Sequence, residues 1–302
     1  MTATARRHSG LLLALATVAS AVAILAPAPA GADPTLIGCD QAAVRVEVTA
    51  DAVLDGGCTY TAGFDITASN VTLDCAGARI ASAPGDSGRG ILVHAPVDVD
   101  LTDVTVRNCR VEGFLNGIKV TRDGFRDLAD GEEFEHSTAR ILLVDNEVAN
   151  TRGVGIFVDG YVSDVRIERN LVTGTGSSGI YLDTGSRANA VLDNEIVDNG
   201  YIENGPDGSP YDAGGTIVWR WGTGREGLSI DGSSDNHVAG NRFSGNAAGG
   251  ILLYKNCGEY PDSGRYYERR DPSDRNLIED NEFVGGRNGI WVGSRMGENT
   301  LP

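Results

Sequence analysis

Short apolar runs separated by glycine, asparagine and other polar residues follow one another along most of the chain, and they recur at a fixed spacing. The stretch from Asn146 to Leu182 contains one such unit twice: Asn-x-Val, a few small or polar residues, then Gly-Ile-aromatic-aliphatic. Asn146 and Asn170 are 24 residues apart, and so are Gly155 and Gly179. A period of about 20–30 residues with such turns is typical of a stacked solenoid.

Both elements of the unit can be followed through the chain. The Asn-x-aliphatic element occurs at Asn146, Asn170, Asn194, Asn241 and Asn281, with Cys109 at the equivalent place upstream. The Gly-Ile-x-aliphatic element, with Leu for Ile in one copy, occurs at Gly117, Gly155, Gly179, Gly227, Gly250 and Gly289. The first element precedes the second by 8 or 9 residues in every rung except that of Asn194, where the gap is 33.

Each aliphatic run is too short for a helix and alternates between apolar and polar positions, which predicts strands. Because the strands lack hairpin spacing, we expect each to stack in parallel on its own copies, one rung per ~4.8 Å. The sequence therefore predicts an all-β, single-domain, right-handed parallel β-helix. We expect the recurrent asparagine to adopt a left-handed backbone conformation in a turn and to bond its amide to the next rung. The alternative is an all-β sandwich rich in Asn and Gly by chance.

Residues 1–32 have the pattern of a signal peptide. Arg6 and Arg7 precede an apolar run from Leu11 to Leu25, and small residues lead to an expected cleavage after Ala32. The two arginines leave twin-arginine export open. We therefore expect a secreted protein whose mature part begins at residue 33, with residues 33–63 as an N-terminal cap region.

The net charge of the chain limits the kinds of binding partner that we expect. The formal charge is −17, and loss of the two leader arginines makes it −19. Such an acidic chain is not expected to bind nucleic acid. After the leader, no stretch is long and apolar enough to span a membrane. We expect a monomer.

Five cysteines remain, and outside the cell they can pair. Cys39 and Cys58 flank the first segment and could close the cap region. Cys75 and Cys109 fall at nearly equal places in neighbouring rungs, close enough for a bridge. Cys257 is then left over. The chain ends without a capping element, which a solenoid needs, so we expect the sequence to be truncated at its C-terminus.

Three insertions interrupt the rungs at residues 121–139, 200–226 and 256–275, and all are expected on one side of the stack. Insertions on one face of a solenoid usually build its binding face. They contain many aromatic residues, namely Tyr201, Tyr211, Trp219, Trp221, Tyr260, Tyr266 and Tyr267. These rings could stack on sugars, or they could only pack the loops onto the wall.

Parallel stacking also predicts two outward columns after the recurrent glycine. The second position carries Lys119, Phe157, Tyr181, Ser229, Leu252 and Trp291. The fourth carries Thr121, Asp159, Asp183, Asp231, Tyr254 and Gly293. Three carboxylates at ~5 Å spacing repel unless a cation or a proton lies among them. A calcium site at Asp159, Asp183 and Asp231, acid–base catalysis, and an ordinary turn role for Asp all remain open.

Lys255 follows the fourth position and is one of only two lysines. Many arginines surround it in sequence, namely Arg225, Arg265, Arg269, Arg270, Arg275, Arg287 and Arg295. Clustered arginines can bind carboxylates, and neighbouring cations can make a lysine a better base. Alternatively, the arginines pair with acids of the same loop, namely Asp262, Glu268, Asp271 and Asp274.

The rungs over residues 64–302 resemble the repeats of pectate-lyase-like β-helix proteins. The segments REGLSIDGS, GGILLYKNCGE, RYYERR and NGIWVGSRMGENTLP, within residues 225–302, resemble secreted bacterial alginate-lyase-like polysaccharide lyases. The resemblance implies β-elimination on an anionic uronate polymer, in which a base removes the C5 proton, an acid protonates O4 and cations neutralise the carboxylate. The Asp-Pro-His-Glu motif of mannuronan C5-epimerases and the Gly-His-Gly of polygalacturonases are absent from the sequence.

The resemblance implies Lys255 as the base and a tyrosine as the acid, with Tyr211, Tyr254 and Tyr181 as candidates. The residues expected to bind the substrate are Arg225, Arg269, Arg270, Arg295, Tyr181, Trp219 and Trp291. No cofactor is expected to be required, although Ca²⁺ is possible at the aspartates. A glycoside hydrolase using two of those aspartates, a C5-epimerase, and a non-catalytic carbohydrate-binding protein remain alternatives.

Overall fold

The computed structural model describes residues 33–82, 88–201, 225–255 and 270–293, and the backbone of two short strands at 209–212 and 217–220. Residues 34–302 cluster as one compact unit. The predicted signal peptide lies outside the described residues. Within the described part, no helix is long and apolar enough to cross a membrane.

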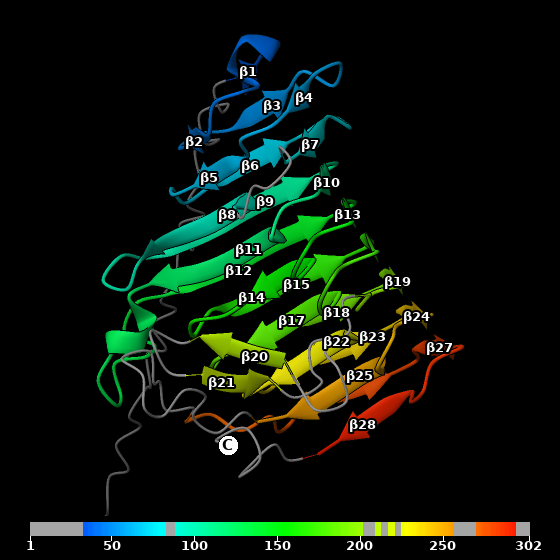
Figure 1. Cartoon of the computed structure of the whole chain (residues 1–302). Coiled ribbons are helices and arrows are strands. Elements are labelled where there is room, and N and C mark those ends of the chain that lie inside the picture. Colours follow the sequence, from blue (N-terminus) through cyan, green and yellow to red (C-terminus); the bar gives the residue numbers. More distant parts are fainter. Residues whose placement is uncertain are drawn as a thin grey trace, which may run out of the picture. The chain divides into compact units, whose positions relative to one another are not determined.

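Three parallel sheets wind around a common core, and each contributes one strand to every rung except the first, in which the second sheet has none (Figure 1). The first sheet contains, in spatial order, β1 (Thr35–Ile37), β3 (Ala52–Leu54), β6 (Val71–Asp74), β9 (Leu101–Arg107), β12 (Thr138–Val144), β15 (Ser163–Glu168), β18 (Ala190–Leu192), β23 (His237–Ala239) and β26 (Leu277–Glu279). The second contains β4 (Thr59–Tyr60), β7 (Arg79–Ala81), β10 (Arg110–Glu112), β13 (Glu147–Ala149), β16 (Leu171–Thr173), β19 (Glu195–Val197), β24 (Arg242–Ser244) and β27 (Glu282–Val284).

The third sheet carries the predicted Gly-Ile strands. It contains β2 (Val46–Val48), β5 (Phe64–Ile66), β8 (Arg89–Pro96), β11 (Asn116–Asp123), β14 (Ile156–Val158), β17 (Ile180–Asp183), β22 (Glu226–Asp231), β25 (Gly249–Tyr254) and β28 (Ile290–Val292). Outside these sheets lie two 3-10 turns, η1 (Cys39–Gln41) and η2 (Phe125–Asp127), and an antiparallel hairpin of β20 (Ser209–Asp212) and β21 (Ile217–Arg220). The predicted parallel β-helix is confirmed.

The register agrees with the spacing of the repeat. Ile118 pairs with Ile156, and Ile156 with Ile180. Ile180 then pairs with Leu228, so the strands stay in register across the long insertion of the Asn194 rung. The Ile and the aliphatic residue two positions later point inward and are fully buried in most rungs, as at Ile156 and Val158. The core is therefore a set of stacked aliphatic columns.

The recurrent glycine lies where the second sheet meets the third. A Cβ added to Gly117 would lie 2.3 Å from Cγ1 of Val148, and one added to Gly155 would lie 2.6 Å from Cγ1 of Val172. Both distances are too short for a real contact. Glycine recurs here because the chain turns against the core side chains of the next rung.

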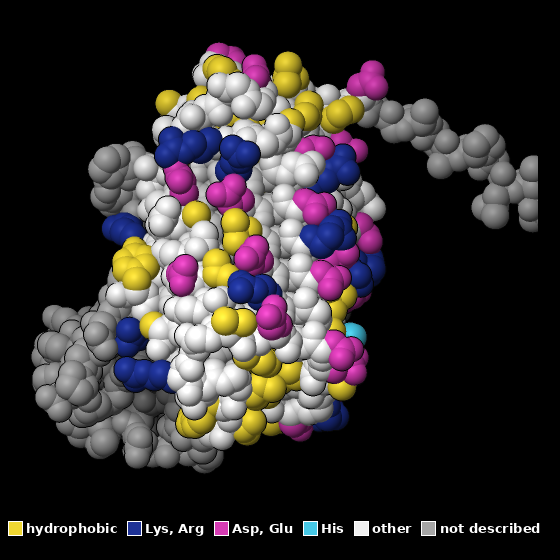
Figure 2. Space-filling view, turned by 90° about the vertical axis from the view of Figure 1, so that its right-hand side faces the viewer, with side chains coloured by type: hydrophobic (Ala, Val, Ile, Leu, Met, Phe, Trp, Pro, Cys, Tyr) yellow, Lys and Arg dark blue, Asp and Glu magenta, His cyan; other side chains and the backbone are white. Residues whose placement is uncertain are grey.

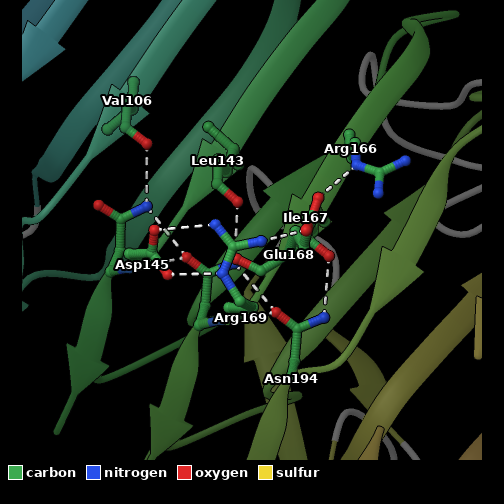
Figure 3. A network of polar contacts seen from close by, with 10 residues as sticks. Val106, Leu143, Asp145, Arg166, Ile167, Glu168, Arg169 and Asn194 are labelled. Atoms are coloured by element: carbon green, nitrogen blue, oxygen red, sulfur yellow. Dashed lines mark hydrogen bonds and ion pairs between the residues drawn. The ribbon is translucent and has the colours of Figure 1, made fainter. Parts of the chain in front are cut away.

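The asparagines form the predicted ladder (Figure 3). Oδ1 of Asn170 accepts hydrogen bonds from the backbone N–H and the Nδ2 of Asn146, each at 3.0 Å. The same two bonds link Asn170 to Asn194, and the ladder continues to Asn241 and Asn281. Each Nδ2 in the ladder interior also donates to the carbonyl of a preceding strand residue, as Asn194 does to Ile167 at 2.9 Å.

One detail of that prediction is wrong. The left-handed conformation belongs to the residue before the ladder asparagine, for example Asp145 (φ 55°) and Arg169 (φ 53°). The asparagine itself has to keep its amide in line with the stack, and the preceding residue makes the turn. Two further ladders were not predicted: Asn189–Asn236–Asn276, and Thr175–Asn199–Asn246.

Both predicted disulfides are present. Cys39 is bonded to Cys58, and Cys75 to Cys109. Cys257 lies outside the described residues. The predicted cap region, residues 33–63, already supplies strands β1 to β4, which pair in register with later rungs.

Ion pairs connect neighbouring rungs on the outside of the stack. Examples are Arg107 with Asp74 at 2.9 Å and Arg169 with Asp145 at 2.9 Å. Figure 2 shows basic and acidic side chains next to one another rather than in separate patches on the face it presents. The net negative charge is therefore partly compensated pair by pair on this surface.

Candidate active site

The outer face of the third sheet brings the predicted columns together. Pairing between strands places Lys119, Phe157, Tyr181, Ser229, Leu252 and Trp291 in one row. It also places Asp183 beside Asp231, and Asp231 beside Tyr254. The first predicted column is confirmed over its whole length, and the second is confirmed for Asp183, Asp231 and Tyr254. Their side chains lie outside the apolar core, so their identity is not dictated by core packing.

A cation and two stacked rings run along the first of these columns. Nζ of Lys119 lies 4.4 Å from the ring centroid of Phe157, and the rings of Phe157 and Tyr181 stack at 5.2 Å. The same Nζ donates to Oδ2 of Asp159 at 2.8 Å, and the two side chains are 12% and 3% exposed. The other oxygen of Asp159, Oδ1, is buried and has no hydrogen-bond partner within the described part of the chain.

Tyr181 reaches the next rung. Its hydroxyl donates to Oδ2 of Asp231 at 2.7 Å. Asp231 is completely buried, whereas Tyr181 is only partly buried. A partly exposed phenol whose hydroxyl donates to a buried carboxylate is suited to proton transfer.

A second tyrosine–carboxylate pair lies on the neighbouring strands. The hydroxyl of Tyr254 donates to Oε1 of Glu226 at 3.0 Å, and Oε2 of Glu226 accepts the backbone N–H of Arg225. Tyr254 and Glu226 are 3% and 1% exposed. Sequence reasoning missed Glu226, although an acid directly before the recurrent glycine could have been noticed.

The three aspartates have different partners. Asp159 binds Lys119, Asp231 accepts from Tyr181, and Asp183 accepts the backbone N–H of Thr184 at 2.7 Å. Within the described residues, the carboxylate oxygens of these three aspartates do not all lie within 4.8 Å of one another. Calcium binding by the three aspartates stays a prediction.

Lys255 lies at the end of the third sheet, beside a short segment that returns from the third insertion. Its Nζ donates to the carbonyl oxygen of Arg270 at 3.0 Å. Burial raises the pKa of the neighbouring Asp271 carboxyl, the charge of Glu133 raises it further, and Lys255 opposes the shift. Asp271 lies against the turns that follow β17 and β22, at Gly185 and Gly232. A Cβ added to Gly185 would lie 2.8 Å from Oδ2 of Asp271.

The first insertion covers these turns. Phe125 and Phe134 contact the ring of Tyr161 edge-on, and the guanidinium of Arg187 lies 3.3 Å from the centroid of Phe134. Oε1 of Glu133 accepts a hydrogen bond from Nη1 of Arg270 at 2.8 Å. The insertion at 121–139 is thereby connected through Arg270 to the segment near Lys255.

Several predicted site residues have other partners or positions. Arg270 pairs with Asp130 and Glu133 of the first insertion. Arg275 pairs with Asp235 and with Asp274, the latter as the alternative interpretation expected. Nε of Arg225 donates to the carbonyl oxygen of Gly200 at 2.9 Å.

The remaining predicted residues are only partly visible. Trp291, at the last described rung, is 38% exposed. Tyr211 and Trp219 lie on the hairpin strands β20 and β21, whose side chains are not described, and Arg269 and Arg295 lie outside the described residues. Their roles stay predictions.

A shallow hollow lies elsewhere, at the turns between the first and second sheets. Its lining includes Asp145, Glu147 and Arg169. Asp145 and Arg169 are bonded to each other. The hollow contains none of the tyrosine–carboxylate pairs, so the outer face of the third sheet is the stronger candidate site.

A family model described as "Right handed beta helix region" matches residues 35–223. The chain belongs to this family. The predicted handedness of the β-helix is therefore confirmed. A comparison with the curated proteins gives no match.

Solved structures similar to this β-helix include the A-module of the mannuronan C-5 epimerase AlgE6 from Azotobacter vinelandii, at 18% identity and a TM-score of 0.41, covering 83% of this chain and 57% of that one. The alginate lyase from Paenibacillus sp. str. FPU-7 is 12% identical with a TM-score of 0.45, and 83% of this chain covers 99% of it. The periplasmic alginate epimerase AlgG is 14% identical with a TM-score of 0.42, covering 83% of this chain and 58% of that one. The chain thus spans little more than half the length of the AlgE6 and AlgG chains. These likenesses concern the fold alone.

Proposed function

We propose that this β-helix is an exported polysaccharide lyase that cleaves an anionic uronate polymer by β-elimination on the outer face of its third sheet. The observation that supports this most is the row Lys119, Phe157, Tyr181, in which the Tyr181 hydroxyl is bonded to the buried Asp231. The row combines a cation, two rings and a proton-transfer group on a surface that core packing does not require to be polar.

The row meets the needs of an elimination. The reaction requires a proton acceptor at C5, a cation near the substrate carboxylate to stabilise the charge that develops there, and a surface that fixes the sugar ring. The rings of Phe157 and Tyr181 provide an apolar surface for a pyranose. Lys119 lies two rungs, roughly 10 Å, from Tyr181, on the scale of one to two sugar units.

The sequence resemblance implies Lys255 as the base. In support, Lys255 follows strand β25 of the same sheet, and its charge acts on the carboxyl of Asp271. Against it, the ammonium already donates to the Arg270 carbonyl. The base assignment is therefore tested separately from the reaction class.

Export is part of the proposal. Two disulfides within the first rungs favour an oxidising compartment, as expected for a secreted or periplasmic protein. The signal peptide predicted over residues 1–32 favours the same conclusion from the sequence.

The test is incubation of the mature protein with alginate, with pectate and with a neutral glucan as control, with and without a calcium chelator. A lyase increases the ultraviolet absorbance of unsaturated sugar ends with a uronate polymer and not with the neutral one. Loss of activity on chelation would support the predicted calcium site. A change in uronate composition without unsaturated ends would favour a C5-epimerase, and new reducing ends alone a hydrolase; either result rejects the lyase.

Within that assay, Lys255→Met tests the base. We expect a loss of about 10²-fold in rate if Lys255 removes the proton, and nearly the same loss for Lys255→Arg, because a guanidinium stays protonated near neutral pH. Activity close to that of the wild type in Lys255→Met would exclude Lys255 as the base without affecting the lyase assignment.

A further inference from the structure

We propose that Asp231 is the positioning residue of Tyr181, and that Tyr181, rather than Tyr254 or Lys255, receives the substrate proton. The proposal rests on the proposed lyase function and assigns a specific role to Asp231, for which the sequence left a calcium site, acid–base catalysis and a turn role open. Three observations support it: the relative exposure of the two tyrosine pairs, the direction of the Tyr181 hydrogen bond, and the packing that fixes the ring.

Exposure distinguishes the two pairs. Tyr254 and Glu226 are 3% and 1% exposed, so this pair is enclosed and its hydroxyl is not accessible to a polymer. Tyr181 is only partly buried, while its acceptor Asp231 is 0% exposed. The Tyr181 pair therefore has one accessible partner and one that is shielded from water, the arrangement that a proton relay requires.

The hydrogen bond gives the direction of transfer. A phenol has one hydrogen, and Tyr181 donates it to Oδ2 of Asp231 at 2.7 Å. With its one hydrogen donated to Asp231, the hydroxyl can act toward a substrate only as an acceptor, so in this state Tyr181 accepts rather than donates. This reverses the acid role that the family resemblance implies for a tyrosine.

Packing holds the pair in place. The ring of Tyr181 stacks on Phe157 with an interplanar angle of 19°, and Phe157 in turn lies against Lys119. Asp231 belongs to β22, directly beside β17 in the sheet. A ring fixed on one side by stacking and at its hydroxyl by a buried acceptor has little freedom, which favours proton transfer at a defined point.

The step balances as follows. The oxygen of Tyr181 takes the proton from C5 while the Tyr181 proton moves to Oδ2 of Asp231. The C5–H electron pair forms the C4–C5 double bond, and the C4–O4 pair leaves with O4, which is protonated by water. Tyr181 stays neutral throughout, and Asp231 returns its proton to solvent after the product leaves.

Asp231→Asn tests the proposal, because the amide oxygen can still accept the Tyr181 hydrogen but cannot hold the proton. We expect kcat on the uronate polymer to fall about 10²-fold with little change in KM, and the acidic limb of the pH profile to disappear. Tyr181→Phe should lose as much, and the double variant no more than either. Glu226→Gln, the same change in the enclosed pair, should keep the acidic limb.

A second measurement needs no substrate. Tyrosinate absorbance is followed against pH in the wild type, Asp231→Asn, Tyr181→Phe and the double variant. Removing the Asp231 charge should move the ionisation of one tyrosine down by about one pH unit or more, and Tyr181→Phe should abolish that difference. No shift, or an Asp231→Asn protein with the kcat and pH profile of the wild type, overturns the proposal.

The two proposals can fail separately. If the tyrosinate shift is present but no uronate polymer yields unsaturated ends, the Tyr181–Asp231 pair stands as a coupled unit and the lyase function falls. If unsaturated ends form but neither variant slows the reaction, the lyase stands and the pair is not its base. Denaturant unfolding of each variant shows whether a loss reflects the fold, and Tyr181→Phe serves where Asp231→Asn does not fold.

Discussion

Two columns of polar residues run along this β-helix, and they are built on opposite principles. In the asparagine column, each buried amide binds the same residue type on the next rung, from Asn146 to Asn281. In the aspartate column on the third sheet, three carboxylates at the same strand position bind an ammonium, a backbone N–H and a phenol. One column repeats its partners, and the other changes them at every rung.

The difference separates structure from chemistry. A repeated partner satisfies the turn groups that every rung leaves unpaired, which is what the fold requires of each copy. A partner that changes from rung to rung cannot satisfy a group that every copy of the repeat leaves unpaired. Instead, it places different reactive groups side by side. Polar columns in a solenoid can therefore be sorted by whether their partners repeat, and the following predictions test this rule.

The largest effect is expected in the asparagine column. Asn170→Ala should lower the free energy of unfolding by about 4 kcal/mol, because the Asn146 N–H and the carbonyls of Leu143 and Glu168 lose a partner at about 1–3 kcal/mol each. Urea unfolding measures it. Asn281→Ala, at the half-exposed end of the ladder, should cost less than half as much. Equal and small costs, below about 1 kcal/mol, would show that the ladder is not structural.

A somewhat smaller effect is expected in the aspartate column. Lys119→Met should destabilise by about 3 kcal/mol at neutral pH, because it leaves the almost buried carboxylate of Asp159 without its cation. The double variant Lys119→Met, Asp159→Asn should recover most of the loss, since no buried charge remains. If the single and the double variant are equally stable, the pair does not hold the column together and the contrast between the columns weakens.

The smallest effect concerns the first rung of the ladder, where Cys109 replaces asparagine. The Cys109 N–H already donates to Oδ1 of Asn146 at 3.1 Å, as a ladder asparagine would. In a Cys75→Ala background, Cys109→Asn should therefore be more stable than Cys109→Ala by about 1 kcal/mol, because an amide extends the ladder. Thermal unfolding of the two double variants measures the difference. Equal stability would mean that the ladder cannot be extended past Asn146.

The sequence by itself determined which residues are neighbours along the stack. The 24-residue period placed Asn146, Asn170 and Asn194 in one ladder. Position within the repeat, across rungs of unequal length, placed Lys119, Phe157 and Tyr181 in one row and Cys75 beside Cys109. These inferences hold because a parallel solenoid pairs each strand with its own copy, so that position in the repeat becomes position in space. Even the long insertion did not disturb this rule, since Asp183 and Asp231 still pair across it.

Only the tertiary structure decided which polar groups bind which. Tyr181 and Tyr254 occupy different positions in the repeat, yet both bind a carboxylate, and Glu226 lies before the glycine where other rungs carry Asn116, Val154 or Ser178. The turn residue with positive φ also proved to be the neighbour of the asparagine rather than the asparagine itself. Such choices depend on side-chain reach to within a few tenths of an ångström and on hydrogen-bond angles, and a repeat period specifies backbone stacking without specifying the partner of each side chain.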